Sequence, residues 1–384
     1  MISEDSNVYS NILYLVGILG SFLMAYFFQK LTPNKIKIAQ IFKSFLIASP
    51  MSIVLGLRSI SVGYDTYMYS HYFFGKLEAL PKTEFLFSQS MVLLNRMFGS
   101  DNYTIMLLFF SYATVFFAFY AIEKFNTNNS RAVYVLSYCL IFGLCITDQF
   151  RQLLGCSLFL MAIAYFSNEK RIRGIIYVII GTFTHSTVLV VALVYLVCGL
   201  IEKSEFGNVR VQFSKENSMG FTLNPKALIF FGFVVVVLFL FFTSSSFLDF
   251  LINIVPINYT QYFTTRLNQE SVGLGLVLDS MVIIPMIFLH KYCITHHERT
   301  IFLFGLFVPV FRLCGYMSYF LYRMLYYPEL AVLMLYGVLL RRQGVPCYMK
   351  VIVVLICALF YYINYMYLNN HGAFPYEFYF EKRG

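Results

Sequence analysis

Charged residues are scarce in this sequence, and tryptophan is absent. Charged side chains make up 12% of the 384 residues and hydrophobic ones 59%, whereas soluble domains carry about 25% charged residues. The 19 acidic and 28 basic side chains are too few to cover a soluble protein of this size. They are enough to flank membrane helices, whose apolar faces are solvated by the bilayer core. The mean hydropathy of +0.70 fits the same class.

Motifs for metal or disulfide chemistry are also missing. The sequence contains no D-x-D pair of carboxylates, and none of its eight cysteines forms a C-x-x-C pair. The cysteines lie in or beside apolar runs, where cysteine acts as a small packing residue. We therefore expect no metal and no other cofactor. Basic cytoplasmic loops account for the net charge of +9, so no nucleic-acid partner is expected.

Long apolar runs predict an all-α polytopic integral membrane protein with about 12 transmembrane helices, since one span needs roughly 20 apolar residues. Ten of these runs are 10–29, 41–57, 102–122, 131–147, 151–167, 226–246, 271–290, 300–317, 323–340 and 349–368. Residues 174–200 are too long for one upright helix and carry a His-Ser pair near their middle. This stretch therefore predicts two helices that meet at His185.

Basic residues set the predicted orientation. With the amino terminus outside, roughly twice as many Lys and Arg side chains fall on the inner side as on the outer side. Without the break at His185, every later loop would change side. The sequence then predicts one transmembrane domain over 1–384, outer-face loops at 58–101 and 247–270, and a cytoplasmic loop at 201–225. Residues 86–99 could span, re-enter or lie flat, and we favour a helix lying flat at the outer interface.

Five polar residues that are energetically unfavourable in a bilayer lie toward the predicted outer face, each on a separate segment. They are Arg58, Arg151, His185, Arg312 and Arg323. Charges near the bilayer interior usually face the interior of the helix bundle or a wet cavity, so we expect these five to gather at one depth. Arginine holds phosphate oxygens through paired hydrogen bonds. Such a group at the outer face indicates a ligand that combines a lipid diphosphate with sugars.

Each of these residues also has a simpler structural explanation. An arginine at the end of a span also anchors its helix at the headgroups. Arg312 also fits a buried ion pair with Asp279 or Glu329, and His185 also fits a helix cap at the break. Asp65, which follows Gly-Tyr, also fits the closure of a turn.

Several motifs together resemble a known family. In chain order they are R-x4-G-x-D-T-x2-Y in LRSISVGYDTYMY, then TEFLF, then FRQLLG at the head of a span, then FTHS, with PYEFYF near the end of the chain. Their order and spacing resemble the EpsG-like branch of the Wzy-type polysaccharide polymerases. Residues 40–200 carry the resemblance well, and 225–384 carry it loosely. Gly155 and Cys156 depart from the small aliphatic residues usual after FRQ.

The resemblance implies a membrane glycosyltransferase with a GT-C-like helical bundle similar to that of the O-antigen ligases. Such a protein is multi-pass in the bacterial plasma (inner) membrane, with its active site facing the periplasm or outside. It polymerises undecaprenyl-diphosphate-linked oligosaccharide repeat units into O-antigen, capsule or exopolysaccharide. Expected partners are that lipid-linked oligosaccharide, the lipid bilayer, and a chain-length regulator and flippase of the same pathway.

This chemistry assigns roles to the predicted site. Arginines that are already in position stabilise the charge of the departing diphosphate, and an acceptor hydroxyl needs a nearby base. The expected diphosphate ligands are Arg58, Arg151, Arg312 and Arg323, and the candidate bases are His185 and Asp65. His185 is preferred because imidazole is easily neutral near pH 7.

Three further residues are expected to support the site. Gln152 and Tyr67 are expected to orient the substrate. Asp148 lies three residues before Arg151, on the same face of a predicted helix, and is expected to hold that arginine in place.

Two other functions compete with polymerisation. A flippase or exporter of lipid-linked saccharide also needs basic residues inside a bundle, but we find no repeat between the two halves of the chain of the kind common in transporters. An acyltransferase would need a His-carboxylate pair at the inner face, where His296, His297 and Glu298 are the candidates. With His290, these histidines show no metal-ligand spacing and are expected in a solvated loop.

Overall fold

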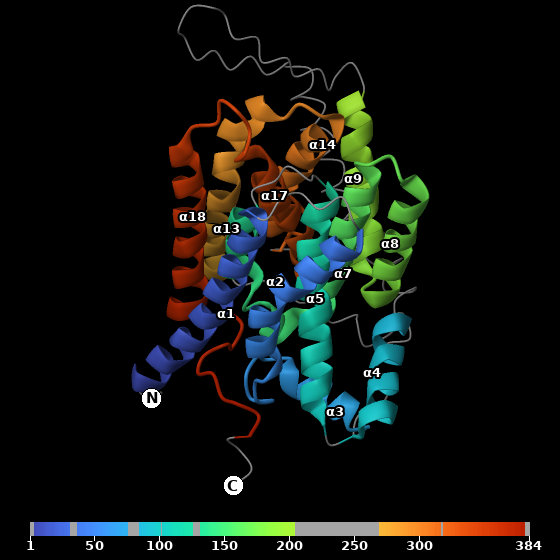
Figure 1. The fold of residues 1–384 in the computed structure, drawn as a ribbon, viewed down its shortest axis with the longest axis vertical. Coiled ribbons are helices and arrows are strands. Elements are labelled where there is room, and N and C mark those ends of the chain that lie inside the picture. The colour runs from blue at the N-terminus through green and yellow to red at the C-terminus, as the bar shows by residue number, and fades with distance from the viewer. Residues whose placement is uncertain are drawn as a thin grey trace, which may run out of the picture. The chain divides into compact units, whose positions relative to one another are not determined.

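The computed structural model describes residues 4–30, 37–75, 84–100, 102–125, 131–203, 269–315 and 318–380. Within these ranges the chain forms helices and no strand (Figure 1). The chain divides into two compact units, one made of residues 1–190 with 336–384 and the other of residues 191–335. The all-helical prediction is therefore confirmed.

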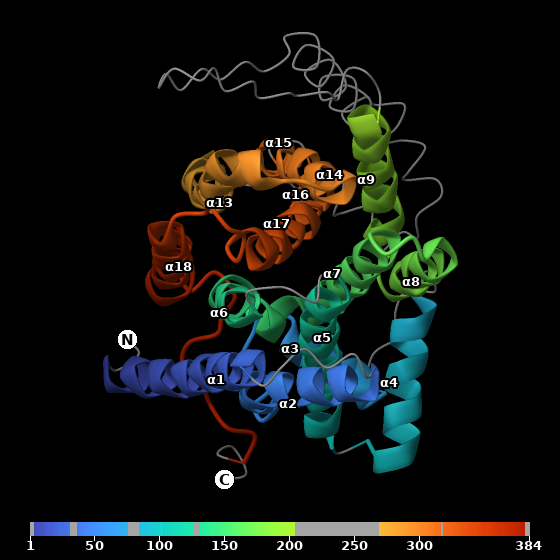
Figure 2. The same ribbon diagram turned by 45° about the horizontal axis from the view of Figure 1, so that its top comes forward.

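The first unit contains most of the described helices. They are α1 (Glu4–Lys30), α2 (Lys37–Gly56), α3 (Thr66–Phe73), α4 (Phe85–Phe98), α5 (Tyr103–Phe125), α6 (Arg131–Phe142), α7 (Ile146–Phe166), α8 (Arg171–Thr184), α18 (Cys347–Tyr361) and the π-helix η4 (Tyr362–Tyr367). Helix α2 packs between α1 and α5, α5 packs on α7, and α7 packs on α8, while α6 packs on α1 and α18 (Figure 2).

Apart from α13, the helices that lie wholly in the second unit are short. The unit contains α13 (Gln269–Leu289), the 3-10 helix η3 (His290–Tyr292), α14 (His296–Gly305), α15 (Phe307–Cys314) and α16 (Tyr319–Arg323). Helices α9 (Thr187–Lys203) and α17 (Tyr326–Leu339) each begin in one unit and end in the other. Within this unit, α15 packs on α13, α14 and α16.

Six helices among the described residues are long and apolar enough to cross a membrane. They lie at Asn7–Lys30, Ile38–Gly56, Tyr103–Phe125, Ile146–Phe166, Gly273–Tyr292 and Cys347–Tyr367. The chain is thus a polytopic membrane protein, as predicted. Shorter helices occupy the other predicted spans in the described part, and predicted span 226–246 lies outside it, so a total of 12 stays a prediction. The GT-C-like arrangement stays a prediction as well.

The predicted break at His185 is confirmed. Helix α8 ends at Thr184 and α9 begins at Thr187. His185 between them has extended backbone angles, with φ −153° and ψ 118°. Residues 174–200 therefore form two helices and not one long span. The predicted side of every later loop depends on this break.

Two helices lie in the predicted outer-face loop 58–101. Helices α3 and α4 pack against the first residues of α5 (Figure 1). Helix α4 buries Phe87, Met91 and Leu94, which recur at helical spacing along one face. This amphipathic pattern agrees with a helix that lies flat, although its depth in a bilayer stays a prediction. The predicted loops 201–225 and 247–270 fall almost wholly outside the described residues.

The segment after η4 folds back over the first unit. In that segment, the carbonyl of Ala373 accepts a hydrogen bond from the Tyr14 hydroxyl at 2.7 Å. The backbone N–H of Tyr376 donates to Ser10 Oγ at 2.7 Å. Phe378 forms an isolated antiparallel bridge with Arg58. Residues 368–380, which we call the C-terminal strap, therefore join α1 to the loop that follows α2.

Candidate functional site

A buried carboxylate joins two of the residues predicted from the sequence. His185 Nδ1 donates to Glu84 Oε1 at 2.6 Å, and Arg151 Nη1 forms an ion pair with Glu84 Oε2 at 2.6 Å. All three side chains are buried. One acidic group therefore holds a cation and an imidazole that come from separate segments, and we call these three residues the Glu84 triad.

The local sequence explains how the three segments meet. Glu84 directly precedes α4, whose buried face fixes the start of that helix. Arg151 lies on α7, a helix buried almost all round between α5 and α8. His185 lies at the extended break after α8, and α8 packs on both α4 and α7. At this break the backbone leaves the helical conformation, and the His185 imidazole reaches Glu84 at the start of α4.

Aromatic rings surround the arginine of the triad. The Arg151 guanidinium carbon lies 5.7 Å from the ring centroid of Tyr69 and 5.8 Å from that of Phe87. The Phe150 ring packs on Tyr69, with centroids 4.4 Å apart. Rings at these distances attract a cation through their electron-rich faces. They also exclude water, which strengthens the ion pair with Glu84.

Arg58 lies in a different setting from Arg151. Its side chain is fully buried, and its N–H groups are directed at backbone carbonyls. Nη1 donates to the carbonyl of Leu55, and Nη2 donates to that of Thr147 at 3.2 Å. Burial lowers the pKa of Arg58 to about 10, which still leaves it cationic at neutral pH. In this arrangement Arg58 ties the end of α2 to the start of α7.

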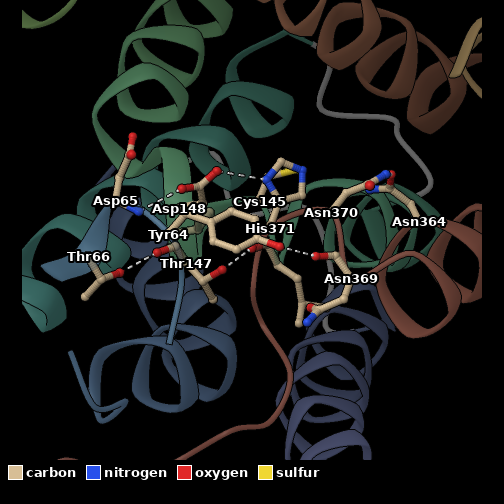
Figure 3. Close-up of polar contacts among 12 residues, drawn as sticks. Tyr64, Asp65, Thr66, Cys145, Thr147, Asp148, Asn364, Asn369, Asn370 and His371 are labelled. Atoms are coloured by element: carbon tan, nitrogen blue, oxygen red, sulfur yellow. Dashed lines mark hydrogen bonds and ion pairs between the residues drawn. The ribbon is translucent and has the colours of Figure 1, made fainter. Parts of the chain in front are cut away.

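A second polar cluster lies where the C-terminal strap meets the start of α7 (Figure 3). His371 Nδ1 lies 3.2 Å from Asp148 Oδ2, and His371 Nε2 lies 3.2 Å from Cys145 Sγ. The Tyr365 hydroxyl lies 3.0 Å from the same sulfur. Burial alone would lower the pKa of His371, but Cys145 and Asp148 oppose it and raise that pKa to about 10.

The prediction that Asp148 holds Arg151 is wrong. The Asp148 carboxylate contacts His371, and it also accepts from the backbone N–H of Asp65 at 3.0 Å. The physical reason is a kink in α7, where Gln149 has φ −114° and ψ 35°. The kink breaks the helical spacing that would place residues 148 and 151 on one face. Glu84 takes the position expected for Asp148.

The turn at 63–66 is fixed to the rest of the first unit at every residue. The four bonds are Gly63 N to Gly372 O at 2.8 Å, Tyr64 Oη to Asn369 O at 3.0 Å, Asp65 N to Asp148 Oδ1 at 3.0 Å and Thr66 Oγ1 to Thr147 O at 2.6 Å. Gly63 has φ +89°, and a side chain there would collide with the Thr147 carbonyl. Only glycine fits this position.

The remaining site residues of the first unit differ in exposure. Asp65 is partly exposed and Tyr67 is exposed, whereas Gln152 is buried on α7 beside Arg151. In Figure 3 the Asp65 carboxylate is directed away from Asp148 and His371. Gln152 therefore shares the interior environment of Arg151. Asp65 belongs to the surface turn, and Tyr67 lies just after it, in the first turn of α3.

Arg312 and Arg323 belong to the second unit. Arg312 Nη1 lies 3.4 Å from Asp279 Oδ2, which is one of the two pairings foreseen from the sequence, and its guanidinium lies 4.7 Å from the Tyr322 ring centroid. The Arg323 guanidinium lies 4.8 Å from the ring centroid of Tyr319. The predicted gathering of these two arginines with Arg58 and Arg151 stays a prediction.

The histidines predicted at the inner face do not form the solvated loop that we expected. His296 begins α14 and pairs with Glu202, which also contacts Arg299 Nε at 2.5 Å. Glu298 closes a capping box with Thr295 and accepts the backbone N–H of that residue at 3.1 Å. The carboxylate of Glu298 therefore caps the start of α14. Across the described ranges, no group of three or more His, Cys, Asp or Glu is arranged to hold a metal ion.

A sequence model of the EpsG family matches residues 40–378. The chain belongs to the EpsG family. Membership indicates a polysaccharide polymerase with glycosyltransferase-like chemistry, and it confirms the resemblance seen in the sequence motifs. The match extends through the second unit and most of the C-terminal strap, where the motifs resemble the family loosely. No curated protein and no solved structure matches the chain.

Sequence reasoning missed two residues that organise this EpsG-family site. Glu84 lies in the TEFLF motif, where an acidic side chain precedes an apolar helix. His371 lies in the C-terminal strap, four residues after η4 ends at Tyr367. The available signal for Glu84 was its place in the TEFLF motif, directly before an apolar helix. For His371 no local pattern pointed to Asp148.

Removing the Glu84 carboxylate should destabilise the protein strongly. Glu84→Ala removes the carboxylate that pairs with the buried Arg151, so we expect a loss of about 3–5 kcal/mol in the free energy of unfolding. The control is Glu169→Ala, because the side chain of Glu169 is 74% exposed and its pairing with Arg171 is a surface contact. Unfolding in detergent measures both variants, and equal losses would contradict the role of Glu84.

The raised pKa of His371 makes a prediction about pH. Its pKa lies above the unfolded value of 6.5, so protonation of His371 stabilises the fold fully below that value and the effect is lost as pH rises toward about 10. The difference in Tm between the natural protein and His371→Asn should shrink over this range. His71→Asn is the control. A difference that stays constant from pH 6 to about 10 would contradict the assignment.

Proposed function

We propose that this EpsG-family chain polymerises undecaprenyl-diphosphate-linked oligosaccharide repeat units at the outer face of the bacterial plasma membrane. The product is O-antigen, capsule or exopolysaccharide. The oxygen of an acceptor sugar hydroxyl bonds to the anomeric carbon of the donor, and the bond from that carbon to the lipid diphosphate breaks. The Glu84 triad is the observation that supports this proposal best, since it combines a buried cation and an imidazole in a family of polymerases.

Arg151 is the proposed ligand of the departing diphosphate. A guanidinium has five N–H donors in a fixed planar fork, so the contact of Nη1 with Glu84 is compatible with phosphate contacts from the same side chain. The aromatic rings around Arg151 keep its surroundings poor in water. A fixed cation in such surroundings stabilises developing negative charge far better than in water.

His185 is the proposed base. A proton on Nδ1 directed at Glu84 leaves the lone pair on Nε2, which then takes the proton of the acceptor hydroxyl. The imidazolium that forms lies 2.6 Å from a carboxylate, which stabilises it. Glu84 thus acts on His185 as the acidic member of a catalytic triad acts on its histidine. Asp65, on the surface turn, is the alternative base.

The other arginines have different proposed roles. The donors of Arg58 are directed at the carbonyls of Leu55 and Thr147, so in this proposal Arg58 positions α7 and does not contact substrate. Arg312 and Arg323 are proposed as further diphosphate ligands, with Asp279 orienting Arg312. Gln152 is proposed to orient the substrate from the same turn of α7 as Arg151.

The competing functions differ from polymerisation in what they require. A flippase moves lipid-linked saccharide without forming a glycosidic bond, so it needs no base beside the cation. The pairing of His185 with Glu84 therefore favours transfer chemistry. An acyltransferase at the inner face would need a His-carboxylate pair available for catalysis. Glu298 is used in the capping box, and Glu202, which pairs with His296, also forms an ion pair with Arg299.

Arg151→Ala should abolish long-chain polysaccharide and leave single-repeat products. Purified protein is incubated with a synthetic undecaprenyl-diphosphate repeat unit and a chelator, and products are separated on a gel. The natural protein should give a ladder, and loss of one stabilising donor should slow chain formation by about 10²–10³-fold. Arg151→Lys should rescue poorly because a point charge loses the bidentate geometry.

The control for Arg151 is Arg96→Ala, because Arg96 is exposed on α4 in the same predicted outer-face loop. It should give a normal ladder. A ladder of normal length from Arg151→Ala would contradict the site. Absence of any ladder from the natural protein would contradict polymerase activity and favour the flippase.

His185→Gln should slow turnover without loss of binding. Glutamine keeps a hydrogen-bonding group near Glu84 but takes up no proton, so we expect a decrease of about 10²–10⁴-fold in kcat. Retention of radiolabelled lipid-linked repeat on the purified variant measures binding separately. Unchanged turnover would rule out His185 as the base, and a parallel loss in Asp65→Asn would identify Asp65 instead.

A further inference from the structure

The surface turn at 63–66 and the first turn of α3 that follows it carry exposed groups in fixed positions. Tyr64 is 66% exposed and Tyr67 is 58% exposed, and Asp65 lies between them in the sequence. Large apolar rings at a protein surface are normally mobile and carry no fixed partners. Here each residue of the turn is bonded to α7 or to the C-terminal strap (Figure 3).

The tyrosine rings themselves are also restrained. The Tyr64 hydroxyl donates to the Asn369 carbonyl at 3.0 Å, and its ring lies against Gly372, where an added Cβ would approach ring carbon Cε1 to 3.0 Å. The Tyr67 ring packs on His71 with centroids 4.0 Å apart. His71 in turn contacts the Tyr67 carbonyl through Nδ1 at 2.9 Å. Both rings are therefore exposed and ordered at once.

The Asp65 carboxylate faces away from the interior. The backbone N–H of Asp65 is held by Asp148, and the Asp65 carboxylate is directed away from Asp148 and His371 in Figure 3. Asp148 itself is held by His371 of the strap. Two buried charged groups thus support the placement of one acidic group at the surface.

We propose that Tyr64, Asp65 and Tyr67 form a saccharide subsite that binds a sugar ring of the acceptor repeat unit. This proposal rests on the proposed polymerase function. A sugar ring presents apolar C–H faces, which pack on aromatic rings, and neighbouring hydroxyls, which donate to a carboxylate. Restrained tyrosines lose little conformational freedom when they bind, so the fixed turn favours affinity.

The chain provides a direct way to observe this subsite, because it contains no tryptophan. Tyr67→Trp introduces a single indole whose fluorescence reports on that position. The probe is the oligosaccharide released by mild acid from the polysaccharide that the host makes. Tyr348→Trp is the matched control, because Tyr348 is 61% exposed and begins α18, away from the turn in sequence.

Saccharide should change the emission of Trp at position 67 in a saturable way and leave that of the Tyr348→Trp protein unchanged. Adding Asp65→Asn should weaken the response. An emission change with undecaprenyl diphosphate or empty phospholipid vesicles, and none with saccharide, would assign the tyrosines to lipid headgroups and overturn the proposal. No change with any probe would also overturn it.

A kinetic test separates this subsite from the polymerase function. In the ladder assay, Tyr67→Ala should raise the KM for acceptor by about 10-fold and change kcat little. Tyr64→Phe, which keeps the ring but loses the bond to Asn369, should give a smaller increase. Ladder formation with unchanged KM in both variants would overturn the subsite alone. No ladder from the natural protein would overturn the polymerase function, and the fluorescence response would then still decide whether the turn binds saccharide.

Discussion

The Glu84 carboxylate, placed between the Arg151 guanidinium and the His185 imidazole, is the interaction on which the arrangement of the first unit depends. Removing one partner of a buried ion pair is strongly unfavourable, so the burial of Arg151 on α7 depends on the Glu84 carboxylate at the start of α4. The same carboxylate fixes the orientation of His185 at the break between α8 and α9. One acidic group thereby joins three segments.

A second set of contacts supports the same helix at its first residues. The start of α7 receives Arg58 from the loop after α2 and His371 from the C-terminal strap. These contacts surround the kink at Gln149, where the backbone departs from helical angles. Polar groups of this kind are satisfied only in one arrangement, so they restrict how the turn at 63–66 is placed. The buried polar groups at the start of α7 therefore also hold the turn that carries the exposed Tyr64.

The sequence predicted the elements of the fold far better than the pairing of its polar side chains. Apolar run length placed the helices and family motifs placed Arg151 and His185, because both signals are local. The partner of His185 lies 101 residues away, and that of His371 lies 223 residues away. No periodicity encodes such pairings. For that reason Glu84 and His371 were missed, and Arg151 was assigned to Asp148, its neighbour on an ideal helix.

Some errors came from signals that were present. Thr295 and Glu298 have the spacing of a capping box, which marks the start of a helix where we expected a solvated loop. Arg58 is a different case, because its binding of diphosphate stays a prediction. In the structure its Nη groups donate to main-chain carbonyls, a contact that side-chain type and depth alone do not reveal.

The central claim is that Glu84 and Arg151 act as one unit in the folded protein. A double-mutant cycle tests it most directly, using Glu84→Gln, Arg151→Met and the double variant, with the free energy of unfolding in detergent as the measured quantity. Coupled buried residues of this kind show interaction energies of up to about 3 kcal/mol, so the double variant should lose clearly less stability than the two single losses added together. Losses that add within about 0.5 kcal/mol would contradict the account.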